Sequence, residues 1–213
     1  MSGRNDLNAA SIAPLADSQL PQLVDVLARA FCSNPVNRAV IRSDDPDRCF
    51  RSNRDRMRIL LPMALRHGWV LAATLDGELA GGLVACPPGR FPLPPPPLMD
   101  RLRFTMRQGW AVARRWEVVF ESLDSLHPVE PHWHLGVLGV DRRAQSRGVG
   151  TALLSRWLEE VDRDGMPAYL ETESERNVRF YARSGFSLAG ETSILGVRVW
   201  CMKRPPAGRR RNN

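Results

Sequence analysis

Residues 132–164 constrain the fold more than any other part of the chain, because their hydrophobic pattern changes once, at a glycine-containing turn. The apolar run at 132–140 is typical of a buried strand. The turn that follows contains Gly148 and Gly150, and apolar residues then recur at helical spacing over 151–164. A strand, a turn and an amphipathic helix in this order predict a sheet with a helix packed on its face.

The turn itself has the composition of a phosphate-binding turn. Gly148 and Gly150 carry no side chain, so a ligand can approach the backbone closely. The first amides of the following helix have no partner within it, and they point out at its positive end. The run lacks the lysine of a P-loop and the third glycine of a dinucleotide fingerprint. Glycine content alone favours phosphate binding and a merely tight turn equally.

Strands and helices also alternate over the rest of the chain. Before the turn, the patterns predict a strand at 11–16 and then a helix from Asp17 or Ser18 to Phe31, which Asn34-Pro35 stops. A second helix is predicted to start at 44–47, with Pro62 near a bend or end. A hairpin of 69–75 with 79–86, one helix over 98–120 and a loop over 123–130 follow. After it, they predict a strand at 168–171, a helix at 177–184 and closing strands at 186–194 and 198–202. We therefore expect an α/β fold with a mixed sheet in one domain, 1–204, and a disordered basic tail, 205–213.

Residues 87–130 form the segment with the least regular pattern. Prolines at 87–97 fix φ and remove amide donors, which favours a stiff surface loop over a recognition site for a proline-binding module. In 98–120, apolar residues recur at near-helical spacing, which is typical of a core stripe and also suits the wall of a substrate pocket.

The charge and the cysteines exclude some classes of protein. The formal net charge is +7, but the arginines are spread out and not interleaved with aromatic residues, so nucleic-acid binding is not favoured. No apolar run approaches a membrane span and the N-terminus lacks a signal-peptide core, so we expect a cytoplasmic protein with no membrane partner, as a monomer or homodimer. The four cysteines lack any CxxC spacing, which predicts reduced thiols: Cys32, Cys49, Cys86 and Cys201.

Two motifs, on either side of the predicted helix 151–164, resemble those of the GCN5-related N-acetyltransferase (GNAT) family. The first is Gln145-Ser-Arg-Gly148-Val-Gly150, which is similar to the family's Gln/Arg-x-x-Gly-x-Gly/Ala signature. The second is the run from Asn177 through Tyr181 to Gly185-Phe186. The runs at 133–140, 170–177 and 200–202 are similar to the branch of the family that acetylates puromycin, whereas 87–130 is not.

The resemblance implies both a fold and a reaction. The fold is a central, mostly antiparallel twisted sheet with one parallel, splayed strand pair, flanked by helices. The reaction moves an acetyl group from acetyl-CoA to an amine. The pantetheine would pair with Leu138, Gly139 and Val140, and Asn177 would contact the cofactor from the second helix. The pyrophosphate would take the amides of Gln145, Ser146, Arg147, Gly148, Val149, Gly150 and Thr151.

The same resemblance implies the catalytic groups. Tyr181 would protonate the leaving sulfur, although a core tyrosine with a satisfied hydroxyl is the alternative. The amine must lose a proton, and an amide near Val140 can stabilise the oxyanion. His134 on the cofactor strand has a suitable pKa for the base, Glu171 at the end of the next strand is its rival, and a water chain is a third option. The neighbouring Glu173 and Glu175 are typical of a solvated acidic loop or of a lure for a cationic amine.

Metal and acceptor are the remaining questions. His132 and His134 face the same side of a strand, but no third ligand occurs at a usable spacing, so we expect no metal. The expected acceptor is a primary amine of a small molecule, such as an antibiotic-like aminonucleoside, which implies antibiotic resistance. A protein lysine or N-terminus and a non-catalytic acetyl-CoA sensor are the alternatives. A closed pocket under 87–130 would favour the small molecule, and an open groove would favour a protein.

Overall fold

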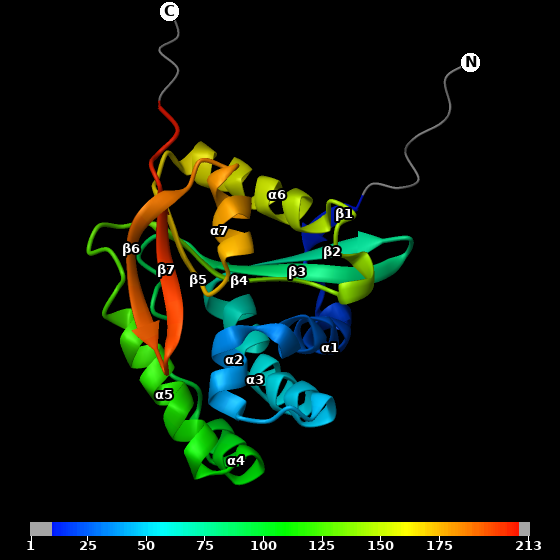
Figure 1. Cartoon of the computed structure of the whole chain (residues 1–213). Coiled ribbons are helices and arrows are strands. Elements are labelled where there is room, and N and C mark those ends of the chain that lie inside the picture. The colour runs from blue at the N-terminus through cyan, green and yellow to red at the C-terminus, as the bar shows by residue number, and fades with distance from the viewer. Residues whose placement is uncertain (1–9, 209–213) are drawn as a thin grey trace, which may run out of the picture.

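One sheet organises the molecule. A computed structural model describes residues 10–208, and in that range seven strands pair in the order β1-β2-β3-β4-β5-β7-β6 (Figure 1). The strands are β1 (Ser11–Pro14), β2 (Trp69–Leu75), β3 (Glu78–Cys86), β4 (Trp133–Val140), β5 (Ala168–Thr172), β6 (Ser187–Ile194) and β7 (Val197–Arg204). Only β4 and β5 run parallel, and all other neighbours are antiparallel. The predicted mixed sheet is confirmed, while residues 209–213 of the predicted tail lie outside the described residues.

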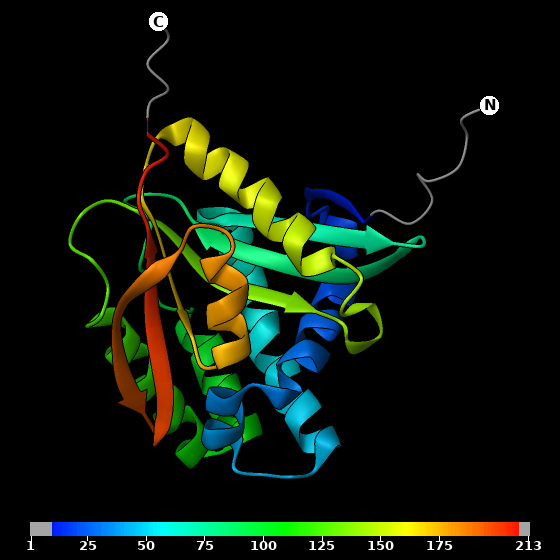
Figure 2. The same cartoon turned by 45° about the horizontal axis from the view of Figure 1, so that its top comes forward.

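Helices cover both faces of the sheet, because successive strand residues point to opposite sides. Leu71 and Ala73 of β2 join the apolar cluster of α6 (Val149–Asp164) and α7 (Glu175–Ala182). Val70 and Ala72 join the cluster of α1 (Leu20–Ala30) and α3 (Pro46–His67) on the other face. Figures 1 and 2 show α6 and α7 on one side of the sheet and α1 and α3 on the other.

A third apolar cluster holds the middle of the chain against the C-terminal hairpin. It joins α2 (Pro35–Ile41), α5 (Trp110–Asp124) and the β6–β7 hairpin through side chains such as Val36, Trp116 and Val199. α4 (Leu98–Gln108) precedes α5 and packs beside it. Much of the 87–130 segment is thereby fixed next to the sheet.

One helix prediction in this region is wrong, and one helix was not predicted. The single helix predicted over 98–120 is two helices, since Gly109 between α4 and α5 has a φ of 85°, in the left-handed region. The residues Asn34-Pro35 stop one helix but also start another, α2. The Asn34 side chain accepts from the Asn37 amide at 2.9 Å, and Pro35 occupies the first helical position.

Other local predictions can be compared directly with the structure. Pro62 lies inside α3, which continues to His67, and Arg58, whose carbonyl Pro62 cannot bond, lies exposed. Each of the four cysteines is free, and burial raises the pKa of Cys86 to about 11. Among the described helices, none has the length and apolar character needed to cross a bilayer.

Candidate active site

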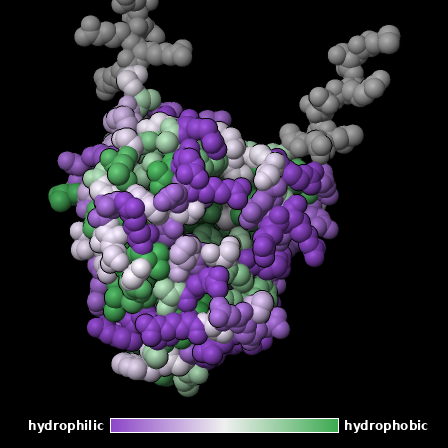
Figure 3. All heavy atoms as spheres, viewed as in Figure 1, coloured by the Kyte–Doolittle hydropathy of each residue, from purple (hydrophilic) through white to green (hydrophobic). Residues whose placement is uncertain are grey.

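The sheet opens between its two parallel strands. Residues 133–135 of β4 pair with 168–170 of β5, and no described residue of β5 pairs with β4 beyond them. On its other edge β4 stays paired with β3 as far as Val140, with a β-bulge at Gly136, which has no partner in β3. Leu138, Gly139 and Val140 therefore lie where β4 has separated from β5. In the view of Figure 1 the surface is hollowed just below α7, where this split opens (Figure 3).

The glycine-containing turn joins β4 to α6. Residues 145–151, predicted to hold a pyrophosphate, lie in this turn and in the first turn of α6. The Gln145 side chain donates to the Val140 carbonyl at 3.2 Å, which ties the turn to the strand. Gly148 has a φ of 82°, so the backbone itself favours glycine there. At Gly150 an added Cβ would make ordinary van der Waals contact with Val140 Cγ2 at 3.6 Å, so crowding by the protein does not itself require glycine there.

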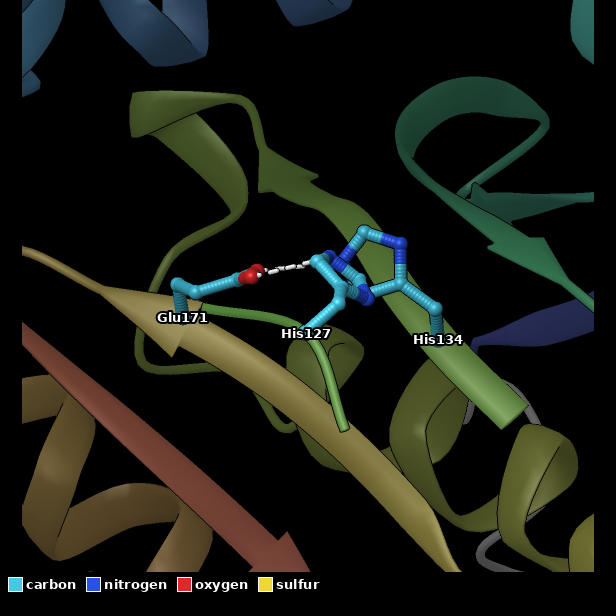
Figure 4. A group of neighbouring side chains, drawn as sticks. All are labelled: His127, His134 and Glu171. Carbon is cyan, nitrogen blue, oxygen red and sulfur yellow. Dashed lines mark hydrogen bonds and ion pairs between the residues drawn. The ribbon is translucent and has the colours of Figure 1, made fainter. Parts of the chain in front are cut away.

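The two candidate bases are in direct contact (Figure 4). Nε2 of His134 on β4 lies 3.0 Å from Oε2 of Glu171 on β5. His127, from the loop between α5 and β4, puts its Nε2 3.1 Å from the other oxygen of the same carboxylate. All three side chains are only 8% exposed. Burial alone would raise the pKa of Glu171, but the imidazoles of His134 and His127 outweigh it and lower the pKa to about 2.

The proline-rich segment covers this cluster. The ring of Phe91 stacks on His127 with 3.7 Å between centroids and meets His134 edge-on at 4.4 Å. Residues 87–97 contain neither helix nor strand. The sequence marks neither Phe91 nor His127 as a site residue, because each reaches the cluster from a loop without periodicity.

The chain is similar to known proteins over most of its length. The family model described as the acetyltransferase (GNAT) family matches residues 37–186, well over half of the chain. The chain belongs to this family. It is therefore an acetyl-CoA-dependent acetyltransferase, and the predicted family, fold and enzyme class are confirmed.

Solved structures agree with this assignment. A structure from Corynebacterium glutamicum, described as histone acetyltransferase HPA2 and related acetyltransferase, is 26% identical with a TM-score of 0.72, covering 93% of this chain and 97% of that one. Arylalkylamine N-acetyltransferase 2 from Aedes aegypti is 14% identical, with a TM-score of 0.64 and coverage of 93% and 99%. PaiA N-acetyltransferase from Thermoplasma acidophilum, in complex with coenzyme A, is 15% identical, with a TM-score of 0.57 and coverage of 92% and 99%. The last two share the fold.

In this acetyltransferase the candidate acid comes from a different element than the candidate bases. Tyr181 lies buried on α7, with its ring 5.1 Å from that of Phe180 and 5.9 Å from that of Phe186. Burial, and then the charge of Glu173, raise the pKa of its hydroxyl, which stays protonated. Within residues 10–208, no hydrogen bond joins Tyr181 to His134 or Glu171. Asn177 is exposed on the same helix.

Two further ionisable side chains, Glu173 and Arg56, interact electrostatically with each other. Glu173 follows β5, and its carboxylate accepts a hydrogen bond from Asn34 Nδ2 at 3.0 Å. Burial raises the pKa of Glu173, and the bond from Asn34 opposes that rise. The Arg56 guanidinium of α3 lies 4.2 Å from the centroid of the Trp116 ring, and burial lowers its pKa to about 10, against the charge of Glu173. Glu173 is thus partly buried and hydrogen-bonded, whereas Glu175 is exposed.

The structure brings together three side chains that could bind a metal ion, a set that the sequence spacing does not reveal. His127 supplies the third ligand that the sequence spacing does not offer, and its ligand atom lies with those of His134 and Glu171 within 4.8 Å. The nitrogen–oxygen contacts of 3.0 and 3.1 Å are those of direct ion pairs. The cluster therefore joins the two predicted bases, His134 and Glu171, to a third ionisable side chain, His127.

Proposed function

We propose that this acetyltransferase transfers the acetyl group to a primary amine of a small molecule, by direct attack and without an acyl-enzyme. The observation that carries this proposal is the cover over the face that bears His134 and Glu171. Phe91 lies against His134, and the third apolar cluster holds α5 to α2 and to the β6–β7 hairpin. A face covered in this way favours a small acceptor over a polypeptide in an open groove.

In this proposal acetyl-CoA lies in the split. Its pantetheine runs along β4 and bonds the backbone of Leu138, Gly139 and Val140, which supports the sheet as an added strand would. Its pyrophosphate takes amides from Gln145, Ser146, Arg147, Gly148, Val149, Gly150 and Thr151 at the positive end of α6. Asn177, exposed on α7, contacts the cofactor from the opposite side.

The chemistry follows from these positions. The neutral amine attacks the thioester carbonyl carbon, an amide near Val140 stabilises the oxyanion, and the carbon–sulfur bond then breaks. The pair of His134 and Glu171 takes the proton that the amine loses. Tyr181 gives its hydroxyl proton to the leaving sulfur and is reprotonated from water, the role that its place in the family motif implies.

The acceptor has a favoured class and two rivals. Likeness to the puromycin-acetylating branch over 133–140, 170–177 and 200–202 favours an antibiotic-like aminonucleoside. The Corynebacterium glutamicum structure, described as a histone acetyltransferase, is the observation that favours a protein lysine or N-terminus. The intact Gln145, Gly148, Gly150, Asn177 and Tyr181 argue against a non-catalytic sensor.

Thiol release from acetyl-CoA tests the acceptor class. We expect turnover with at least one small amine among puromycin, polyamines and aminoglycosides, and a much lower rate with a lysine peptide. A preference for the peptide would overturn the small-molecule proposal. A calorimetric titration of the same protein with acetyl-CoA separates the two halves of the proposal, since absence of binding would refute the placement of the cofactor in the split.

A further inference from the structure

A chain of polar contacts continues behind the catalytic pair, and the proposed mechanism leaves it unused. His127 contacts Glu171 through Nε2 at 3.1 Å, and its Nδ1 lies 3.2 Å from Nε2 of His132. His132 in turn places its Nδ1 2.8 Å from the backbone carbonyl oxygen of Glu130. Two histidines from one short stretch of the chain, His132 and His127, therefore lead from a backbone carbonyl to the carboxylate.

The carbonyl at the end of this chain fixes where the protons sit. A carbonyl only accepts, so Nδ1 of His132 carries a hydrogen. Burial lowers the pKa of His132, which favours its neutral form and leaves Nε2 as an acceptor. The contact at 3.2 Å is then a hydrogen bond in which His127 donates from Nδ1. Its other nitrogen, Nε2, lies 3.1 Å from Oε1 of Glu171 in an ion-pair contact that lacks hydrogen-bond geometry, and a proton on Nε2 avoids opposing two lone pairs in this buried site.

The Glu171 carboxylate in turn determines which nitrogen of His134 carries the proton. Glu171 is ionised between two imidazoles, so Nε2 of His134 donates to its Oε2 at 3.0 Å. In neutral His134 the lone pair is then on Nδ1. That nitrogen is buried, and no described residue bonds to it. A Cβ added to Gly136 would lie 3.9 Å from it, so Nδ1 faces the bulge where β4 and β5 separate.

We propose that His127, oriented by His132, is a positioning residue that acts through Glu171 to aim Nδ1 of His134 at the acceptor amine, an assignment that rests on the proposed acetyl transfer at this site. It makes His134 the base and Glu171 its orienting partner. The amine proton moves to Nδ1 of His134, whose new positive charge lies beside the carboxylate. His127 balances that carboxylate before the transfer, so the buried cluster of one anion and one cation carries no net charge.

Other ionisable groups surround the cluster. A thiol on β3, a thiol and an ammonium on β7, a phenol on β5 and a carboxyl after β5 face it: Cys86, Cys201, Lys203, Tyr169 and Glu173. Burial raises the pKa of both thiols and of the phenol, which removes them from the range in which histidine titrates. Burial also raises the pKa of the Glu173 carboxyl, so a Glu173→Gln variant is needed to separate its titration.

Nitrogen NMR of the labelled histidines tests the assignment without turnover. The chain has four histidines, and His67 is exposed, so single substitutions assign every signal. Near neutral pH we expect one proton on His132 at Nδ1, one on His134 at Nε2, and protons on both nitrogens of His127. A proton on Nδ1 of neutral His134 would overturn the proposal whether or not an acceptor is known.

Replacing His127 gives the second test. In His127→Gln the positive charge beside Glu171 is lost, so the carboxylate attracts a proton on His134 more strongly. We expect the His134 titration, and the acidic limb of kcat/KM for the best amine, to move up by about one pH unit. Removing Glu173 should leave this difference intact. A uniform loss of kcat/KM at every pH, with an unmoved His134 titration, would reduce His127 to a structural role.

Two controls complete the design. His67→Gln removes an exposed histidine at the end of α3 and should change neither the His134 titration nor the pH profile. Elemental analysis of the purified chain addresses a metal ion at the same three side chains. If the purified protein retained one zinc ion per chain, and His127→Gln lost it, the cluster would be a metal site and the proton assignment would be wrong.

Discussion

At the scale of the residue, one hydroxyl separates the proposed acid from a core tyrosine. Tyr181→Phe keeps the ring between Phe180 and Phe186 and removes only the proton donor. We expect kcat to fall by about 100-fold, the usual range for a lost acid catalyst, while the acetyl-CoA Kd stays the same. A thiol-release assay measures kcat, and calorimetric titration measures the Kd for acetyl-CoA.

The chain's second tyrosine supplies a matched control. The Tyr169 hydroxyl donates to the Leu126 carbonyl at 3.1 Å, so Tyr169→Phe should lower the free energy of unfolding by about 1 kcal/mol and leave kcat nearly unchanged. If Tyr181→Phe behaved like this control, Tyr181 would be a packing residue and the acid would have to be sought elsewhere.

Glu171 ties the active site to stability at low pH. Its pKa is about 2 in the folded chain against an ordinary 4.5, so ionised Glu171 stabilises the fold above about pH 4.5. That contribution, on the order of 3 kcal/mol, is lost as the pH falls from about 4.5 through 2. Thermal unfolding of the wild type and Glu171→Gln at several pH values measures it. The two curves should converge on acidification, and parallel curves would contradict the ion pair.

At the scale of the element, the turn before α6 depends on one backbone conformation. Gly148 has a φ of 82°, and an added Cβ would meet nothing within 4 Å, so any effect of Gly148→Ala comes from backbone strain. We expect a loss of about 1–2 kcal/mol in unfolding free energy, together with weaker acetyl-CoA binding. Gly190→Ala, where an added Cβ also meets nothing and φ is not positive, is the control and should be nearly neutral. Equal effects in both variants would argue against strain.

Local patterns predicted the elements whose burial is local. The β4 strand, the turn and α6 are each specified by their own periodicity, and the observed bounds agree within about two residues. The break at Gly109 and the start of α2 at Asn34 were not predicted, although each has a local cause. Gly109 adopts a positive φ, and Asn34-Pro35 caps and begins α2, so the pattern of apolar residues hid signals that the residue types carry.

The candidate site divides in the same way. Strand alternation and the family motifs marked His134, Glu171 and Tyr181, and the structure brings the first two into contact. His127 and Phe91 reach that pair from loops, so no periodicity in the sequence could place them. Glu173 looked solvated because its partner Asn34 lies near the other end of the chain.

At the scale of the whole molecule, the formal net charge of the protein is +7, opposite in sign to the charge of acetyl-CoA. Long-range attraction should favour acetyl-CoA at low salt, and its Kd should rise by about three-fold or more between about 0.05 and 0.3 M salt. Calorimetric titrations at several salt concentrations measure this slope. Dephospho-CoA has fewer negative charges and should give a shallower slope. Identical slopes for both ligands would exclude a contribution from the missing phosphate.

The short pairing between β4 and β5 has a mechanical consequence. Within residues 10–208, three residue pairs are the whole strand-to-strand link between β1–β4 and β5–β7, and the rest of the seam is open. A bound ligand that hydrogen-bonded to both strands across this gap would stabilise the contact between the two half-sheets, and its release would remove that stabilisation. The stability of the contact between the half-sheets would then change with each turnover. Amide hydrogen exchange in β5 and β7 should therefore be slower when the gap between β4 and β5 is occupied.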